Sequence, residues 1–186
     1  MLKVETVHSN NIGLNSSRRS SKVMTSYFSG HTIALVIYLF IVFGHFAEHL
    51  IQLFQIYFLH MHPKLAGGIL GLYYPQLAQN EVLHIAYNSL QLTGLLVLLP
   101  GFLDLGGQAK VWWRVAIITQ SWHFFEHVLL QAQFLTGNYL FGANHQKSLL
   151  EFVFPRVELH FSYNLLALLP TLIAIFFYFR HKHRNQ

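Results

Sequence analysis

Four long apolar stretches dominate the pattern of hydrophobic and polar positions along the chain. They run from about Thr32 to Leu59, from just after Pro75 to Leu103, from about Trp112 to Leu135, and from just after Pro155 to Phe179. A helix needs about 20 residues to cross the hydrocarbon core of a bilayer, and each stretch is long enough. Membrane-spanning strands would instead be short and alternating. The pattern therefore predicts four transmembrane helices.

Residues 1–30 differ from the rest of the chain in composition. They are rich in Ser and Asn, include Arg18, Arg19 and Lys22, and show little apolar periodicity. We expect a disordered cytoplasmic tail here, followed by a membrane domain over residues 31–186. A cleaved signal peptide fits poorly, because the first apolar stretch begins late, is too long, and is not followed by a small-residue cleavage site.

Charged residues are scarce and unevenly distributed. Only 10% of the residues are charged and 53% are hydrophobic, which is typical of a protein whose main partner is the lipid bilayer. Nine of the twelve Lys and Arg lie in the two terminal segments or at positions 110 and 114, whereas Lys64, Lys147 and Arg156 fall on the other side of the predicted spans. The positive-inside bias then predicts that both termini are cytoplasmic. The basic residues follow no single helical face, so we expect no nucleic-acid partner.

Two polar motifs each occur twice in the apolar stretches. The motif H-F-x-E-H covers residues 45–49 and 123–127, and L-H-x-x-Y-N covers residues 83–88 and 159–164; Gln55 and Gln133 also correspond. Polar residues repeated in register indicate a tandem duplication of a two-helix hairpin, over about residues 32–103 and 112–180. Each unit has two spans, so both copies keep one orientation and are related by an axis along the membrane normal. The predicted fold is an all-α integral membrane protein, a bundle of four transmembrane helices made of two tandem, parallel-related hairpins.

The repeated polar residues are the candidate site. Positions three and four apart share a helical face, so the two His and the Glu of each H-F-x-E-H motif project together. The candidate metal ligands are His45, His49, His84, His123, His127 and His160. Glu48 and Glu126 are candidate catalytic residues, and Tyr87, Asn88, Tyr163 and Asn164 are candidate cofactor-binding residues that orient the imidazoles. Hydrogen bonding between helices is the alternative explanation for buried polar residues. The seven other histidines receive no functional assignment.

The donor set indicates a transition metal. The chain has no cysteine, so thiolate ligands are excluded, and nitrogen and oxygen donors suit iron, which we favour, as well as copper, zinc or manganese. A bound cation would also offset the charge of two carboxylates in the bilayer. Haem b is the alternative cofactor, although His45 and His49 lie only about 6 Å apart along a helix, too close to serve two stacked haems.

Three functions fit this site. The first is a metal-dependent oxidoreductase with a mononuclear or dinuclear centre, acting on a lipophilic small molecule or with a redox partner. The second is a haem-binding electron carrier. The third is a metal or proton transporter, in which four helices would form too thin a wall unless the chain forms an oligomer. The H-x-x-x-H spacing resembles the histidine boxes of membrane di-iron oxygenases such as fatty-acid desaturases, and this resemblance implies oxidoreductase chemistry. It covers only that spacing, and those boxes usually lie at the membrane edge rather than inside the spans.

Overall fold

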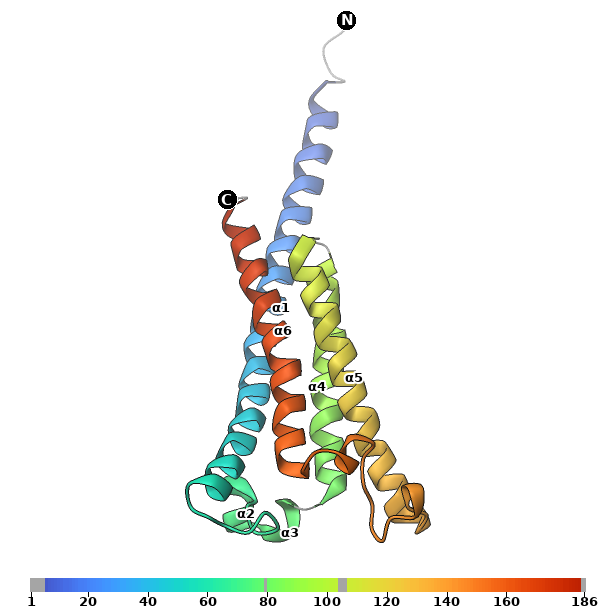
Figure 1. Cartoon of the computed structure of the whole chain (residues 1–186). Coiled ribbons are helices and arrows are strands. Elements are labelled where there is room, and N and C mark those ends of the chain that lie inside the picture. Colours follow the sequence, from blue (N-terminus) through green and yellow to red (C-terminus); the bar gives the residue numbers. More distant parts are fainter. Residues whose placement is uncertain (1–5, 79, 104–106, 185–186) are drawn as a thin grey trace, which may run out of the picture. The chain divides into compact units, whose positions relative to one another are not determined.

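The computed structural model describes residues 6–78, 80–103 and 107–184, and every regular element in these ranges is a helix (Figure 1). The α-helices are α1 (Thr6–Tyr57), α2 (Gly68–Tyr73), α3 (Pro75–Ala78), α4 (Glu81–Leu103), α5 (Gly107–Thr136) and α6 (Arg156–Arg184). Two short 3-10 helices, η1 (Leu140–Gly142) and η2 (Leu150–Phe152), lie in the connection between α5 and α6. The prediction of an all-α protein is confirmed for the described residues.

The chain divides into two compact units, residues 1–37 and 38–186. In the first unit the structure differs from the predicted disordered tail, because α1 begins at Thr6 and residues 6–30 are helical. A helix that is already nucleated propagates at a much smaller cost than a new one, and no proline interrupts this segment. The first five residues of the predicted tail lie outside the described residues.

In the second unit, α5 packs along both α4 and α6 (Figure 1). Trp113 of α5 is fully buried against Phe102 of α4, with ring centroids 3.8 Å apart, and its indole N–H donates to the backbone oxygen of Leu95 at 2.9 Å. The part of α1 in this unit contacts α6 through side chains. Phe46 lies 5.4 Å from Phe161 between ring centroids. These contacts fix the depth at which the polar residues of the four long helices meet.

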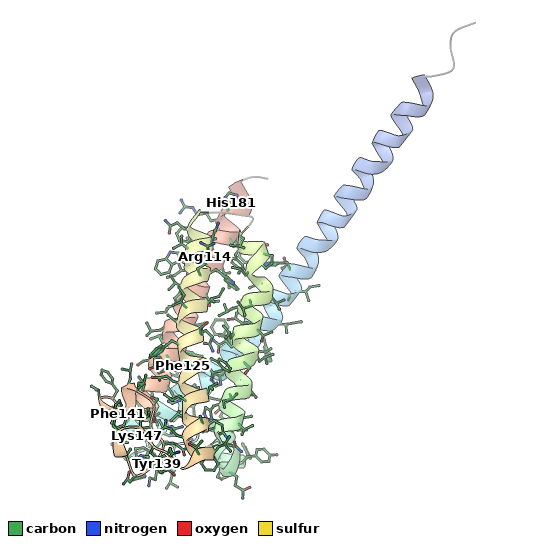
Figure 2. The ribbon with its side chains drawn as sticks, turned by 90° about the vertical axis from the view of Figure 1, so that its right-hand side faces the viewer. Arg114, Phe125, Tyr139, Phe141, Lys147 and His181 are labelled. Atoms are coloured by element: carbon green, nitrogen blue, oxygen red, sulfur yellow. The ribbon has the colours of Figure 1, made fainter. Side chains whose placement is uncertain are left out.

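A glutamine near the end of α1 and another near the end of α5 hold the loops that follow. The side chain of Gln55 accepts a hydrogen bond from the backbone N–H of Gly68 at 2.9 Å and donates to the Gly68 oxygen at 3.1 Å. The side chain of Gln133 likewise donates to the backbone oxygen of Lys147 at 2.9 Å and accepts from the N–H of Leu140 at 3.1 Å. Tyr139 and Lys147 lie at this end of the helices, and Arg114 and His181 at the other (Figure 2).

Three of the described helical segments are long and apolar enough to cross a membrane: Gly30–Tyr57, Glu81–Leu103 and Arg156–His181. The predicted third span, which corresponds to α5, does not meet this criterion. Its polar residues explain why, since Gln120, His123, Glu126, His127 and Gln133 all lie on this helix and all are buried in the protein. Its polar side chains are therefore directed toward the other helices and not toward the surroundings.

Candidate metal centre

All six histidines of the repeated motifs converge in the second unit. They come from α1 (His45, His49), α4 (His84), α5 (His123, His127) and α6 (His160). His127 is central, with its ring centroid 4.9 Å from His160 and 5.3 Å from His84. The His49 ring lies 6.1 Å from that of His160 and 4.7 Å from that of His45. Helical spacing alone predicts the pairs four residues apart, and the packing of the helices brings the pairs together.

Three of these histidines form a group that could hold a metal ion. Each of His123, His127 and His160 offers a ring nitrogen, and these nitrogens all lie within 4.8 Å of one another. The Nε2 atoms of His123 and His127 are 3.1 Å apart. All three residues are buried. On the α1 side, the Nε2 atoms of His45 and His49 approach each other in the same way, at 3.3 Å.

Hydrogen bonds at Nδ1 set the tautomers of several of these histidines. His160 Nδ1 lies 2.8 Å from the backbone oxygen of Arg156, and His84 Nδ1 lies 3.0 Å from that of Asn80. A carbonyl oxygen only accepts, so Nδ1 carries the hydrogen and the lone pair remains on Nε2. His127 Nδ1 is 3.1 Å from a carboxylate oxygen of Glu81, with the same consequence. This arrangement is typical of imidazoles that bind a metal through Nε2.

A fourth histidine follows the same pattern. His49 Nδ1 lies 2.9 Å from the side-chain oxygen of Gln52, three residues later on α1. The corresponding residue of the second half, His127, uses the carboxylate of Glu81 instead. The Nδ1 atoms of these two equivalent histidines thus have different acceptors, an amide oxygen for His49 and a carboxylate oxygen for His127.

Glu81 and Arg156 take part in the site although the sequence analysis assigned them no role. The Glu81 carboxylate accepts from Arg156 as well as from His127, and Arg156 Nε lies 3.4 Å from Glu151. Burial raises the pKa of the Glu151 carboxyl, while the backbone N–H of Ser148, which donates to it at 2.5 Å, opposes that shift. Spacing could have indicated both residues, because Glu81 lies three positions before one ligand and Arg156 four before another.

The two predicted catalytic glutamates have different surroundings. Glu126 is 2% exposed, and its Oε1 atom has no hydrogen-bond partner among the described residues. Glu48 instead accepts backbone N–H bonds from Ile69 at 2.7 Å and Leu70 at 3.3 Å at the start of α2. Gly68 has φ of 71°, and a Cβ there would collide with the Glu48 carboxylate. Glu48 therefore holds a loop, while Glu126 offers a buried carboxylate oxygen that has no hydrogen-bond partner among the described residues.

The predicted cofactor-binding residues contact the histidines in two ways. Tyr87 stacks on His45 with ring centroids 4.9 Å apart, and the Tyr163 ring lies 5.0 Å from that of His123 at a tilt of 31°. The asparagines make backbone contacts instead of imidazole contacts. Asn88 and Asn164 each donate at 2.9 Å to the backbone oxygen of the histidine four residues earlier, His84 or His160. The tyrosines thus position rings, and the asparagines stabilise the helices that carry them.

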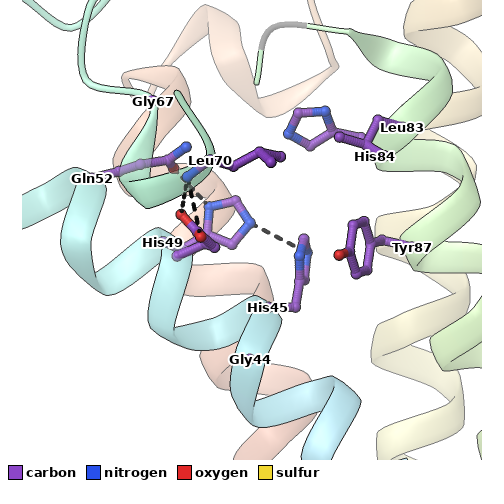
Figure 3. Close-up of a pocket in the computed structure, with 10 residues that line it drawn as sticks. Gly44, His45, His49, Gln52, Gly67, Leu70, Leu83, His84 and Tyr87 are labelled. Carbon is purple, nitrogen blue, oxygen red and sulfur yellow. Dashed lines mark hydrogen bonds between the residues drawn. The ribbon is translucent and has the colours of Figure 1, made fainter. Parts of the chain in front are cut away.

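Two cavities adjoin the histidines. One of about 270 Å³ lies between α1 and α4; it is lined by His45, His49 and His84 and by apolar residues including Leu70 and Leu83 (Figure 3). The other, of about 450 Å³, is more polar and reaches from the histidines to the loops. Its lining includes His49, Glu81, His84, Arg156 and His160. The histidines are therefore accessible from an apolar side and from a polar side.

The residues present fit a directly bound transition-metal ion. Neutral imidazole nitrogens and a buried carboxylate oxygen are donors that iron, copper, zinc and manganese all accept. The buried group of His123, His127 and His160 is the part of the site where ligand atoms already lie close enough to share one ion.

No protein-family model, curated protein or solved structure matches this chain. Its function is therefore inferred from the chemistry of the site.

Proposed function

We propose that this protein is a membrane-embedded, metal-dependent oxidoreductase that acts on a lipophilic substrate. The observation that carries the proposal is the convergence of six histidines, four of which have a hydrogen-bond acceptor at Nδ1 that directs the lone pair to Nε2. In His49 and His127 that Nε2 atom faces the Nε2 atom of a second histidine, at a spacing that a shared metal ion could bridge. Glu126, which belongs to the second H-F-x-E-H motif, is also buried, and a cation would offset the charge of its carboxylate.

The proposed architecture is a bundle of four transmembrane helices with α5 as the fourth span. Its polar residues are buried against the other helices, which is how polar groups are accommodated in a bilayer. Two tandem hairpins account for the matching contacts in the two halves: the His45–Tyr87 and His123–Tyr163 ring pairs, and the loop contacts of Gln55 and Gln133. We place both termini in the cytoplasm, because the end that carries Arg114 is the more basic one.

The site divides between the two halves of the chain. His123, His127 and His160 supply nitrogen donors for one ion, Glu126 is the proposed oxygen donor, and His45, His49 and His84 could hold a second ion beside it. Iron or copper, when bound, supplies the one-electron redox chemistry that the side chains themselves lack. The residues of the chain orient the donors, exclude water from the buried half and present an apolar cavity to a substrate that dissolves in the membrane.

A redox titration of iron-loaded protein tests this function. Protein purified in detergent and loaded with Fe(II) without oxygen should be oxidised by O₂ and reduced again by a lipophilic quinol such as decylubiquinol, with absorbance changes in proportion to bound iron. His127→Ala should lose this cycle, because His127 contacts the rings of three other histidines. His145→Ala is the matched control, since His145 is exposed and lies in the loop between α5 and α6.

Two results would contradict the oxidoreductase. The first is bound iron that keeps one oxidation state under both treatments. The second is metal that crosses sealed vesicles containing the wild-type protein without changing its oxidation state, which would identify a transporter instead.

A further inference from the structure

The two halves of the chain differ at the residue that directly precedes the H-F-x-E-H motif. This residue is Gly44 in the first half and Trp122 in the second. The motifs otherwise correspond, and each half has a ring contact between a histidine and a tyrosine, stacked for His45–Tyr87 and tilted for His123–Tyr163. Gly44 and Trp122, the smallest and the largest residue type, therefore occupy equivalent positions beside the two corresponding ring pairs.

Trp122 closes its half of the site. Its indole N–H donates to the hydroxyl of Tyr163 at 3.2 Å, so the indole lies over the outer end of the ring pair. Tyr163 is 7% exposed and His123 is 1% exposed. The second half of the site is thus covered by a side chain on the surface of α5.

Gly44 leaves the first half open. A Cβ built at Gly44 would have no heavy atom within 4 Å, and Tyr87, the counterpart of Tyr163, is 38% exposed. The 270 Å³ cavity continues here into an apolar groove of about 510 Å³ between α1 and α4. The cavity and the groove share Gly44, His45, Leu83 and Tyr87 (Figure 3).

The lining changes from apolar in the groove to polar in the cavity. The groove is bordered by Phe40, which is 82% exposed, and by Leu90, which is 50% exposed, so its mouth is apolar on both helices. The cavity at its inner end is lined by His45, His49 and Gln52. Glu48 also lines the cavity, and its negative charge disfavours an anionic head group there.

We propose that the groove between α1 and α4 binds a neutral, hydroxyl-bearing lipid, with its hydrocarbon chain along Phe40 and Leu90 and its hydroxyl group at His45. From this groove the substrate meets only the first half of the site, because Trp122 covers the corresponding His123–Tyr163 ring pair of the second half. This inference names the substrate class of the proposed oxidoreductase and rests on that function.

Photolabelling with a long-chain alcohol that carries a diazirine group tests the groove. In the wild-type protein the label should map to residues 40–44 and 83–90. Gly44→Trp should lower this labelling about tenfold, the equivalent of about 1.4 kcal/mol in binding free energy, because the added indole fills the mouth as Trp122 does in the second half. Val97→Trp is the matched control, since Val97 is exposed on α4 and does not line the groove; it should leave labelling unchanged.

A second groove variant and a second probe complete the test. Ala86→Trp fills the groove from α4 and should reproduce the loss, so the test does not depend on one variant. A diazirine fatty acid of the same length should label the groove less than the alcohol does. Undiminished labelling in both groove variants, or stronger labelling by the fatty acid, would overturn the proposal. Metal content is measured in parallel, so a labelled wild-type protein without metal would contradict the oxidoreductase and leave the groove intact.

Discussion

Replacing His127 by alanine is expected to remove the metal from the second half of the site. The His127 ring contacts those of His84, His123 and His160, and its Nδ1 is held by Glu81. Loss of a ligand should weaken metal binding by more than the about 10–100-fold that follows from loss of a residue that only orients a ligand. Metal analysis after dialysis measures this, with His145→Ala as the control.

The effect should be larger than that of the corresponding change in the first half. His49→Ala removes a histidine whose nearest ring neighbours are more distant, at 6.1 Å from His160 and 6.5 Å from His84, apart from its own helical partner His45. A metal content of His127→Ala equal to that of the wild-type protein would show that the group of three buried histidines is not a metal site.

Replacing Glu81 by glutamine is expected to lower the affinity for metal about 10–100-fold while all six histidines remain. The Glu81 carboxylate accepts from His127 Nδ1 and so keeps the lone pair on Nε2. A glutamine amide can present its NH₂ group to the same nitrogen, which favours the opposite tautomer. It also leaves Arg156 without the negative charge of Glu81, although Glu151 remains at 3.4 Å.

Competition with a chelator of known affinity measures this change. Glu158→Gln is the matched control, because Glu158 accepts a hydrogen bond from Tyr57 at 2.6 Å and, within the described part of the chain, makes no hydrogen bond to the six histidines. Equal affinities in Glu81→Gln, Glu158→Gln and the wild-type protein would mean that Glu81 does not orient a metal ligand.

The helices and the histidine cluster follow from the length of the apolar stretches, the four-residue spacing of the histidines and the repeated motifs. Apolar stretches of sufficient length specify helices wherever a bilayer is the solvent, and α1, α4, α5 and α6 each cover one predicted span. Spacing of four residues places His123 beside His127 without knowledge of the tertiary structure. The repeated motifs then indicate which histidines belong together, and the structure brings all six into one cluster.

Other features depend on contacts that no local pattern specifies. Glu48 and Glu126 occupy equivalent motif positions, yet Glu48 accepts from the backbone N–H of Ile69, whereas Glu126 Oε1 has no hydrogen-bond partner among the described residues. The bond between His127 and Glu81 joins residues 46 positions apart and depends on how α4 approaches α5. The helical state of residues 6–30 follows from continuation of α1 and not from any apolar periodicity of that segment.

Metal analysis of the purified protein, combined with its absorption spectrum, tests the central claim most directly. Protein expressed in iron-supplemented medium and purified without chelators should contain one or two transition-metal ions per chain and no Soret band. The triple variant His123→Ala, His127→Ala, His160→Ala should lose at least one of those ions while remaining in the membrane fraction. A wild-type protein with no stoichiometric metal, even after reconstitution, or one with a Soret band that the triple variant lacks, would contradict a directly ligated metal centre.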